Sequence, residues 1–334
     1  MANPLVRVAG TGSCLPERRL TNAELAQMVD TTEDWILMRT GIRERRIAAA
    51  GEFTSDLAVR AGQVALEAAG VEPNDLDLIL VATTTPDLVF PATATMVQRK
   101  LGAHYRQAPA FDIQAVCAGF VYAVTIAEKF ILSGSCSRVL VIGAETFSRI
   151  VDWKDRSTCI LFGDGAGAAV LTAAQGEEGS SGILSTHIYA DGSYRDLLRV
   201  SGGISTGLQP GEDPRVSGVG FVQMRGNEVY KQAVKSMSAA IDDTLIMNGL
   251  ERHHIDWLVP HQANIRIIES IAKRLEVGME QVVVTVDRHG NTSAASVPLA
   301  LDEAVRDGRI KRGDKVLLVA FGGGFTWGSV LIRW

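Results

Sequence analysis

The repeated order of segments along this chain of 334 residues is the feature that most limits how it can fold. Each half contains an apolar run, then a second one, and then a Phe-Gly pair before a last apolar segment. The paired segments are 76–81 with 255–260, 138–142 with 315–319, and 162–165 with 321–324. Matched segments in the same order indicate two copies of one structural unit.

Within each half the order is strand, helix, strand, helix, strand, strand. Uninterrupted apolar strands are typical of sheets that helices cover on both faces. Two such halves packed back to back predict an α/β fold of five layers, α-β-α-β-α. We place the halves at 1–174 and 175–334. The segment 175–220, rich in Gly, Ser and Asp, is interpreted as the connection between them plus surface loops.

The spacing to a later glycine pairs Cys117 with Asn291. Cys117 precedes Gly134 by the same number of residues as Asn291 precedes Gly308. We therefore interpret Asn291 as the counterpart of Cys117. The segments that follow these two residues carry almost no charge near their start, which predicts buried helices in the central layer.

Composition limits the class of function. With 46% hydrophobic residues and a net charge of −5, the chain can bury a core and is not a bulk binder of nucleic acid. Its four cysteines, at 14, 117, 136 and 159, lack Cys-x-x-Cys spacing, so neither a metal site nor a disulfide framework is predicted. The start lacks signal-peptide features, and no apolar run reaches the roughly 20 residues that span a bilayer. We expect a cytoplasmic protein without membrane insertion.

Cys117 lies where a predicted buried strand meets a predicted helix of small and apolar residues. The positive end of a helix dipole favours thiolate, which is the nucleophilic form of cysteine. Cys117 is therefore a candidate to accept an acyl group. The alternative is an inert core cysteine, which is the commoner role for this residue type.

His261 and Asn291 follow predicted strands of the second half, as Cys117 does in the first. Because α/β proteins place their sites where strand carboxyl ends gather, the three side chains are predicted to converge in one pocket. The alternatives are a satisfied core histidine for His261 and a helix N-cap for Asn291, and the cap role is compatible with a place in the pocket.

Four strings of this sequence closely resemble the β-ketoacyl-acyl-carrier-protein synthase III family, the initiating condensing enzymes of bacterial fatty acid synthesis, which have the thiolase fold. They are TTEDWILMRTGIRERR at 31–46, VPHQAN at 259–264, DRHGNTSAASVP at 287–298 and AFGGGFTWGS at 320–329. The resemblance covers essentially the whole chain. It implies a homodimer that takes a coenzyme A thioester and acyl carrier protein as its substrate carriers and needs no cofactor.

The resemblance also implies the reaction. Cys117 attacks an acyl-coenzyme A, with acetyl as the expected starter, and becomes acylated. Malonyl-carrier protein then loses carbon dioxide, and His261 and Asn291 donate hydrogen bonds to the enolate oxygen. The N–H groups of Cys117 and Gly323 form an oxyanion hole for the acyl thioester. Phe321 lies beside the cysteine in the acyl pocket.

Recognition of coenzyme A needs an aromatic face for adenine and cations for the phosphates. Trp35 and Arg39 are candidates, and the resemblance implies that adenine stacks between Trp35 and Arg156 while Asn227 meets the pantetheine arm. Arg45 and Arg46, which belong to a run of charge, are interpreted as solvated.

The segment 265–275 is predicted to be an amphipathic helix with basic residues on its exposed side. By resemblance, this face docks the acidic carrier protein, although an exposed basic helix is more often only solvated. Phe90 is implied to cross the dimer interface and to line the partner's acyl pocket. The carrier-protein candidates are Gln262, Arg266, Lys273 and Arg274.

Two other functions stay open at this stage. One is a related acyl-coenzyme A condensing enzyme of secondary metabolism, of the quinolone or polyketide type. The other is a cysteine thioester hydrolase using Cys117 and His261, against which Asn291 argues because an amide serves an enolate better than a hydrolytic water. The length and branching of the starter acyl group do not follow from the sequence.

Overall fold

The first sheet of the computed structural model belongs to the N-terminal half of the chain. The structure describes residues 3–103, 107–176, 180–203 and 220–334. Parallel strands β5, β4 and β6 form one side of this sheet, and β7 and β1 extend it in antiparallel fashion. In spatial order the strands are β1 (Asn3–Cys14), β7 (Gly165–Gly176), β6 (Arg138–Glu145), β4 (Leu78–Ala82) and β5 (Ala110–Ile113).

The second sheet repeats this pattern with the C-terminal half. Its order is β8 (Gly182–Ala190), β13 (Thr326–Arg333), β12 (Lys315–Gly322) and β11 (Trp257–Pro260). Strands β11 and β12 are parallel, whereas β13 is antiparallel to both of its neighbours. A single parallel bridge from Leu258 to Val282 stands where β5 stands in the first sheet. The predicted duplication is therefore visible strand by strand.

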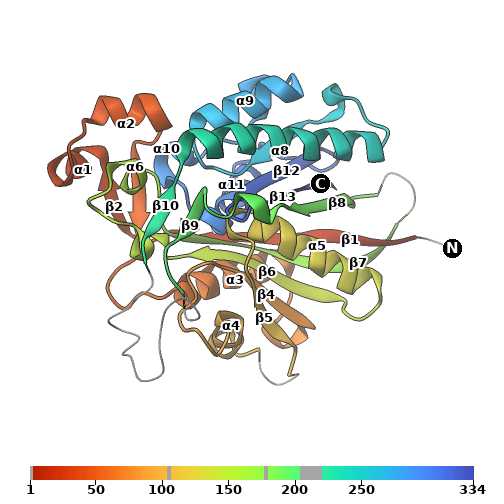
Figure 1. The fold of residues 1–334 in the computed structure, drawn as a ribbon. Coiled ribbons are helices and arrows are strands. Elements are labelled where there is room, and N and C mark those ends of the chain that lie inside the picture. Colours follow the sequence, from red (N-terminus) through yellow and green to blue (C-terminus); the bar gives the residue numbers. More distant parts are fainter. Residues whose placement is uncertain (1–2, 104–106, 177–179, 204–219) are drawn as a thin grey trace.

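Helices complete five layers, which confirms the predicted α/β architecture (Figure 1). Helices α3 and α4 cover the outer face of the first sheet, and α8 and α9 cover that of the second. Between the sheets lie α5 and α11, each in contact with strands of both. The bounds are α3 (Thr54–Ala69), α4 (Thr93–Leu101), α5 (Gly119–Leu132), α8 (Gly226–Met247), α9 (Ile265–Leu275) and α11 (Ser296–Arg306).

The interpretation of 175–220 as connection and loops is wrong in part. Strand β8 lies in this segment and pairs with β13 along its whole length. It is the counterpart of β1, because each forms the outer strand of its sheet. A short ribbon of β9 (Leu198–Val200) and β10 (Val222–Met224) follows. Positions 204–219 lie outside the described residues.

The pairing of Cys117 with Asn291 is also wrong. One 3-10 turn, η2 (Val116–Ala118), leads directly into α5, and another, η7 (Ser293–Ala295), leads directly into α11. Both turns begin at a residue with positive φ, 47° at Val116 and 49° at Ser293. Cys117 therefore matches Ala294. The spacing to the later glycine is equal because α5 has 14 residues and α11 only 11.

The remaining elements join the layers. Among them, β2 and β3 form a two-stranded antiparallel sheet. They are β2 (Arg18–Thr21), α1 (Asn22–Met28), α2 (Glu33–Thr40), β3 (Glu44–Ile47), η1 (Pro73–Asp75), η3 (Phe147–Ile150), α6 (Arg156–Cys159), η4 (Gly192–Tyr194), η5 (Arg252–His254), η6 (Met279–Gln281) and α10 (Val286–His289). Among the described residues, no helix is long and apolar enough to cross a membrane.

Arg45 and Arg46 on β3 are not the solvated pair predicted from the charge run. Arg45 is fully buried, and its guanidinium donates to the carbonyls of Leu20 and Ile160 and to Asn22 Oδ1. Arg46 donates to the carbonyl of Pro16. Arg45 is therefore an internal link between β2, β3 and the segment before β7.

Candidate functional site

Cys117 lies in η2, directly before α5, with only 3% of its surface exposed. Burial raises the pKa of its thiol to about 12, and nearby Glu145 adds to this effect. Desolvation of the charged sulfur therefore opposes the thiolate that the helix dipole favours.

His261 follows β11 directly, and its backbone N–H donates to the carbonyl of Val319 on β12 at 2.8 Å. The side chain is 3% exposed, and burial lowers its pKa to about 3, so the imidazole is neutral at physiological pH. Its Nδ1 lies 2.6 Å from Ser296 Oγ at the start of α11. That contact leaves Nε2 as the nitrogen available to a substrate.

Asn291 is fixed by its backbone and by its side-chain oxygen. Its N–H donates to the carbonyl of Leu161, and its own carbonyl accepts from Gly163. Its Oδ1 accepts from the N–H of Ser293 at 2.9 Å. The amide is 6% exposed, and its NH2 group makes no hydrogen bond to any residue that the structure describes, so it remains available as a donor. The N-cap position of η7 is Thr292, without a side-chain cap hydrogen bond, so Asn291 is not the helix N-cap that was predicted as its alternative role.

The turn that carries Cys117 contacts two segments of the C-terminal half. Turn η2 packs against η7, and a Cβ placed on Gly119 would lie 3.3 Å from Ala294 Cβ. The end of β12 lies over η2, and a Cβ on Gly322, its last residue, would be 2.6 Å from the nitrogen of Cys117. Only glycine at 322 allows this approach. The next residue, Gly323, faces Val116 and Leu198.

The predicted aromatic and cationic candidates for coenzyme A come together on α2 and α6. The guanidinium of Arg39 lies 5.2 Å from the centre of the Trp35 ring, and that of Arg156 lies 4.9 Å from it. Arg156 also donates to the carbonyl of Asp30. Asn227 is exposed near the start of α8, just after β10, the strand that packs against α6.

Helix α9 has the predicted bounds and an exposed basic side formed by Arg266, Lys273 and Arg274. These three side chains form no ion pair within the part of the chain that the structure describes. Asn264 caps the helix by accepting from the Arg266 N–H.

The assignment of Gln262 to a carrier-protein surface is wrong. Its side chain is fully buried and makes four hydrogen bonds to backbone groups. The NH2 group donates to the carbonyls of Pro260 and Val283, and Oε1 accepts from the N–H groups of Thr285 and Val286. Gln262 fastens β11 to the segment before α10, and no partner can reach it.

The two predicted acyl-pocket residues differ in their surroundings. Phe321 on β12 is buried, and its ring lies 4.6 Å from that of Phe325. Phe90 is 82% exposed, beside Leu88 and Val89, which are also exposed. Within one chain Phe90 therefore lines no buried pocket, and its place in a partner's pocket stays a prediction.

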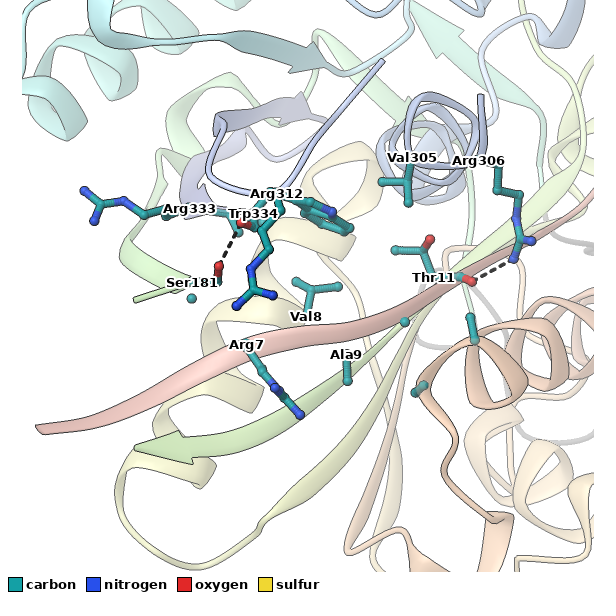
Figure 2. A pocket seen from close by; sticks show the side chains of 15 residues that line it. Arg7, Val8, Ala9, Thr11, Ser181, Val305, Arg306, Arg312, Arg333 and Trp334 are labelled. Atoms are coloured by element: carbon teal, nitrogen blue, oxygen red, sulfur yellow. Dashed lines mark hydrogen bonds between the residues drawn. The ribbon is translucent and has the colours of Figure 1, made fainter. Parts of the chain in front are cut away.

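A cavity of about 520 Å³ lies away from these residues, between β1, the end of α11 and the C-terminus (Figure 2). Arginines line it, and one of them, Arg306, is bound by Asp302 and donates to the carbonyl of Thr11. None of Cys117, His261 and Asn291 lines this cavity.

Sequence reasoning missed Ser296 as a member of the site. The run Thr292-Ser293-Ala294-Ala295-Ser296 supplies three hydroxyl groups at the start of α11, all in buried residues. Three hydroxyl residues in a segment that is otherwise small and apolar could have indicated from the sequence that this segment belongs to a polar site.

Comparison with known proteins shows which protein family this chain belongs to. Residues 111–192 match the family described as 3-oxoacyl-[acyl-carrier-protein] synthase III, and residues 245–334 match that family's C-terminal part. A β-ketoacyl-[acyl-carrier-protein] synthase III of Xylella fastidiosa is 59% identical, with 98% of both chains covered. This chain belongs to the 3-oxoacyl-[acyl-carrier-protein] synthase III family.

Solved structures agree with that membership. The 3-oxoacyl-[acyl-carrier-protein] synthase III of Aquifex aeolicus is 46% identical, with a TM-score of 0.90, 98% of this chain and all of that chain covered. The priming β-ketosynthase of the R1128 polyketide pathway is 38% identical, with a TM-score of 0.90 and coverage of 99% and 96%. The predicted thiolase-type architecture is thus the one this family has. Among the described residues, no cluster of metal-ligating side chains is found.

Proposed function

We propose that this chain catalyses the decarboxylative condensation of an acyl-coenzyme A with malonyl-carrier protein, giving a 3-ketoacyl-carrier protein, coenzyme A and carbon dioxide. This reaction starts fatty acid chains. The observation that carries the proposal is a buried thiol on η2, the turn that packs against η7, together with two neutral N–H donors, His261 and Asn291. The other polar side-chain atom of each donor is held by the 293–296 segment, which contains η7.

In the first half-reaction the sulfur of Cys117 attacks the thioester carbonyl of the acyl-coenzyme A. A bond forms from Sγ to the acyl carbon, and the bond from that carbon to the coenzyme A sulfur breaks. The thiol proton leaves with coenzyme A, so charge balances overall. The N–H groups of Cys117 and Gly323 stabilise the oxyanion, a role that the close passage of the glycine loop over η2 supports.

In the second half-reaction the bond from the malonyl carboxylate to its neighbouring carbon breaks, and carbon dioxide leaves. The electron pair becomes an enolate on the thioester, and His261 Nε2–H and Asn291 Nδ2–H donate to its oxygen. One such preorganised donor is typically worth about 3–4 kcal/mol. The enolate carbon then attacks the acyl carbon on Cys117, and the thiolate that leaves takes up a proton.

The substrate carriers fit two separate surfaces. The stacked cluster of Trp35, Arg39 and Arg156 suits the adenine and phosphates of coenzyme A, with Asn227 toward the pantetheine arm. For adenine to enter, the Arg156 guanidinium must leave the Trp35 face. The exposed cations of α9 suit an acidic carrier protein.

Three further assignments belong to the same proposal. The protein acts as a homodimer in which the exposed Phe90 reaches the acyl pocket of the partner, beside Phe321. It uses no cofactor. The halves 1–174 and 175–334 are duplicated units, as the matching strand orders support.

A second candidate, a condensing enzyme of secondary metabolism, is supported by the likeness to the R1128 priming β-ketosynthase. The identity to the β-ketoacyl synthase III of Xylella fastidiosa is higher, 59% against 38%, which favours the first candidate. Malonyl-carrier protein and malonyl-coenzyme A, offered in parallel, separate the two.

The test measures each half-reaction alone. Purified enzyme is treated with acetyl-coenzyme A, and the adduct on Cys117 is measured by mass spectrometry. Release of carbon dioxide from labelled malonyl-carrier protein is measured separately. We expect His261→Ala and Asn291→Ala to lose decarboxylation by 100-fold or more and to keep acylation. Normal decarboxylation in either variant removes that residue from the role, and rapid release of free acetate by the wild type contradicts condensation.

A further inference from the structure

Among the described residues, the hydroxyl of Ser296 is the only side-chain group that forms a hydrogen bond with the His261 side chain. Ser296 is the first residue of α11 and is 1% exposed. Its Oγ lies 2.6 Å from Nδ1 of His261 and 3.3 Å from the backbone nitrogen of Gln262. The contact thus joins the loop after β11 to the central helix layer.

The proton count at this hydroxyl selects one arrangement. Because a backbone N–H can only donate, Ser296 Oγ accepts from Gln262 and keeps its own proton to give. If that proton goes to Nδ1, every polar atom of the contact is satisfied. If Nδ1 carried the proton instead, the Ser296 hydroxyl would need another acceptor, and none lies within hydrogen-bond distance among the described residues. A buried hydroxyl without an acceptor is unfavourable.

We propose that Ser296 is a positioning residue that accepts from Gln262, donates to Nδ1 of His261 and so holds the imidazole proton on Nε2. The inference deepens the proposed function, on which its catalytic meaning rests. Nε2 is the nitrogen that must donate to the enolate oxygen. An imidazole in the other tautomer would present a lone pair to that oxygen and repel it.

The parallel with Asn291 supports this reading. There the Oδ1 atom accepts from the Ser293 N–H, which leaves the NH2 group as the part of the amide that can donate to a substrate. In each donor the side-chain atom that cannot donate to an enolate, Nδ1 of His261 or Oδ1 of Asn291, is bound by a residue of the 293–296 segment. One short segment, through a backbone N–H at Ser293 and a side-chain hydroxyl at Ser296, therefore orients both donors.

The first experiment observes the tautomer without turnover. Enzyme with ¹⁵N-labelled histidine is studied by long-range proton–nitrogen correlation NMR, and the His261 signals are assigned with His261→Gln. We expect an unprotonated Nδ1 and a protonated Nε2 in the wild type, and a changed Nδ1 shift in Ser296→Ala. A protonated Nδ1 in the wild type overturns the proposal.

The second experiment separates positioning from general structural damage. Ser296→Ala is expected to slow malonyl decarboxylation 10- to 100-fold while Cys117 is acylated at the normal rate. In the His261→Ala background the same substitution is expected to add less than a twofold loss, because Ser296 acts through His261. Independent losses that multiply would contradict the proposal.

The matched control is Ser238→Ala in α8, another buried serine, whose hydroxyl donates to the carbonyl of Val234. It is expected to leave both the histidine signals and the decarboxylation rate unchanged. The two proposals fail in different ways. A wild type with the expected tautomer that releases no carbon dioxide refutes the proposed function, whereas a protonated Nδ1 in an active enzyme refutes only the role of Ser296.

Discussion

Gly322→Ala is the perturbation whose size follows most directly from the structure. The new Cβ would lie 2.6 Å from the nitrogen of Cys117 and 3.1 Å from both the Ala115 oxygen and the Ala118 nitrogen. Carbon contacts normally begin near about 3.5 Å, so the loop or η2 must move by roughly 1 Å. All three facing atoms are backbone, so no side chain can turn aside.

A displacement of that size is expected to lower the rate of Cys117 acylation about 100-fold, because it moves the nucleophile relative to its oxyanion donors. The overpacking should also cost about 1–3 kcal/mol of unfolding free energy. The assay is the rate at which acetyl-coenzyme A forms the adduct on Cys117, followed by mass spectrometry on samples whose folded fraction is known from thermal melting.

Gly192→Ala is the matched control, because a Cβ at this exposed glycine meets nothing within 4 Å and its φ is not positive. It should acylate within twofold of the wild type. Acylation of Gly322→Ala at the wild-type rate would refute the argument, since it would mean that the loop can leave η2 without consequence for the nucleophile.

Four further predictions test other parts of the structure. Burial lowers the pKa of His261 and of His289 to about 3, below the value of about 6.5 for an unfolded histidine. The free energy of unfolding should therefore fall as the pH drops below about 6.5, by about 2 kcal/mol per histidine at pH 5. Urea melts of the wild type and of His261→Ala at several pH values check this. Gln262→Ala should lower stability by at least about 2 kcal/mol and leave the KM for malonyl-carrier protein unchanged in steady-state assays. Arg266→Glu should raise that KM about 10-fold and spare acyl-coenzyme A loading. Trp35→Ala should raise the KM for acyl-coenzyme A about 10-fold, and the carrier-protein KM serves as its control.

Much of the fold could be predicted because its strands are uninterrupted apolar runs. Strands β4, β6, β11 and β12 are buried along nearly their whole length, so their continuous apolar sequence alone reveals them. Strand β8 was missed because only its first two residues are buried, and polar residues break the rest of its pattern. An outer strand with one exposed face gives a weaker signal than a central one.

The ionisation state of Cys117 could not be predicted from its position before a helix. The dipole argument is local, whereas desolvation depends on how much of the chain closes over the sulfur. The turn of β12 and the η7 segment, both far along the sequence, cover it. Arg45 was misread for the same reason, since its acceptors at Leu20 and Ile160 are distant in sequence.

The sequence placed the three catalytic candidates after strands whose carboxyl ends gather, and the family resemblance implied their roles, but the predicted pairing of Cys117 with Asn291 was wrong. Equal spacing suggested that Asn291 repeats Cys117, whereas the structure matches Cys117 with Ala294. A helix shorter by one turn produced the coincidence. The duplication therefore gives two equivalent turns with different surroundings: Cys117 lies on η2, and η7 begins with Ser293, whose N–H binds Asn291 Oδ1.

Burial shifts the pKa values of Cys117 and His261 in opposite directions, and this affects which chemistry the site can perform. Burial raises the thiol pKa to about 12 and lowers the imidazole pKa to about 3, so a thiolate–imidazolium pair is strongly disfavoured in the free protein. A cysteine hydrolase needs such a histidine to take up a proton and to activate water. A histidine that stays neutral is poor at both tasks, but it is well suited to donate one N–H to an enolate. The neutral imidazole therefore fits the donor role that the proposed function gives to His261.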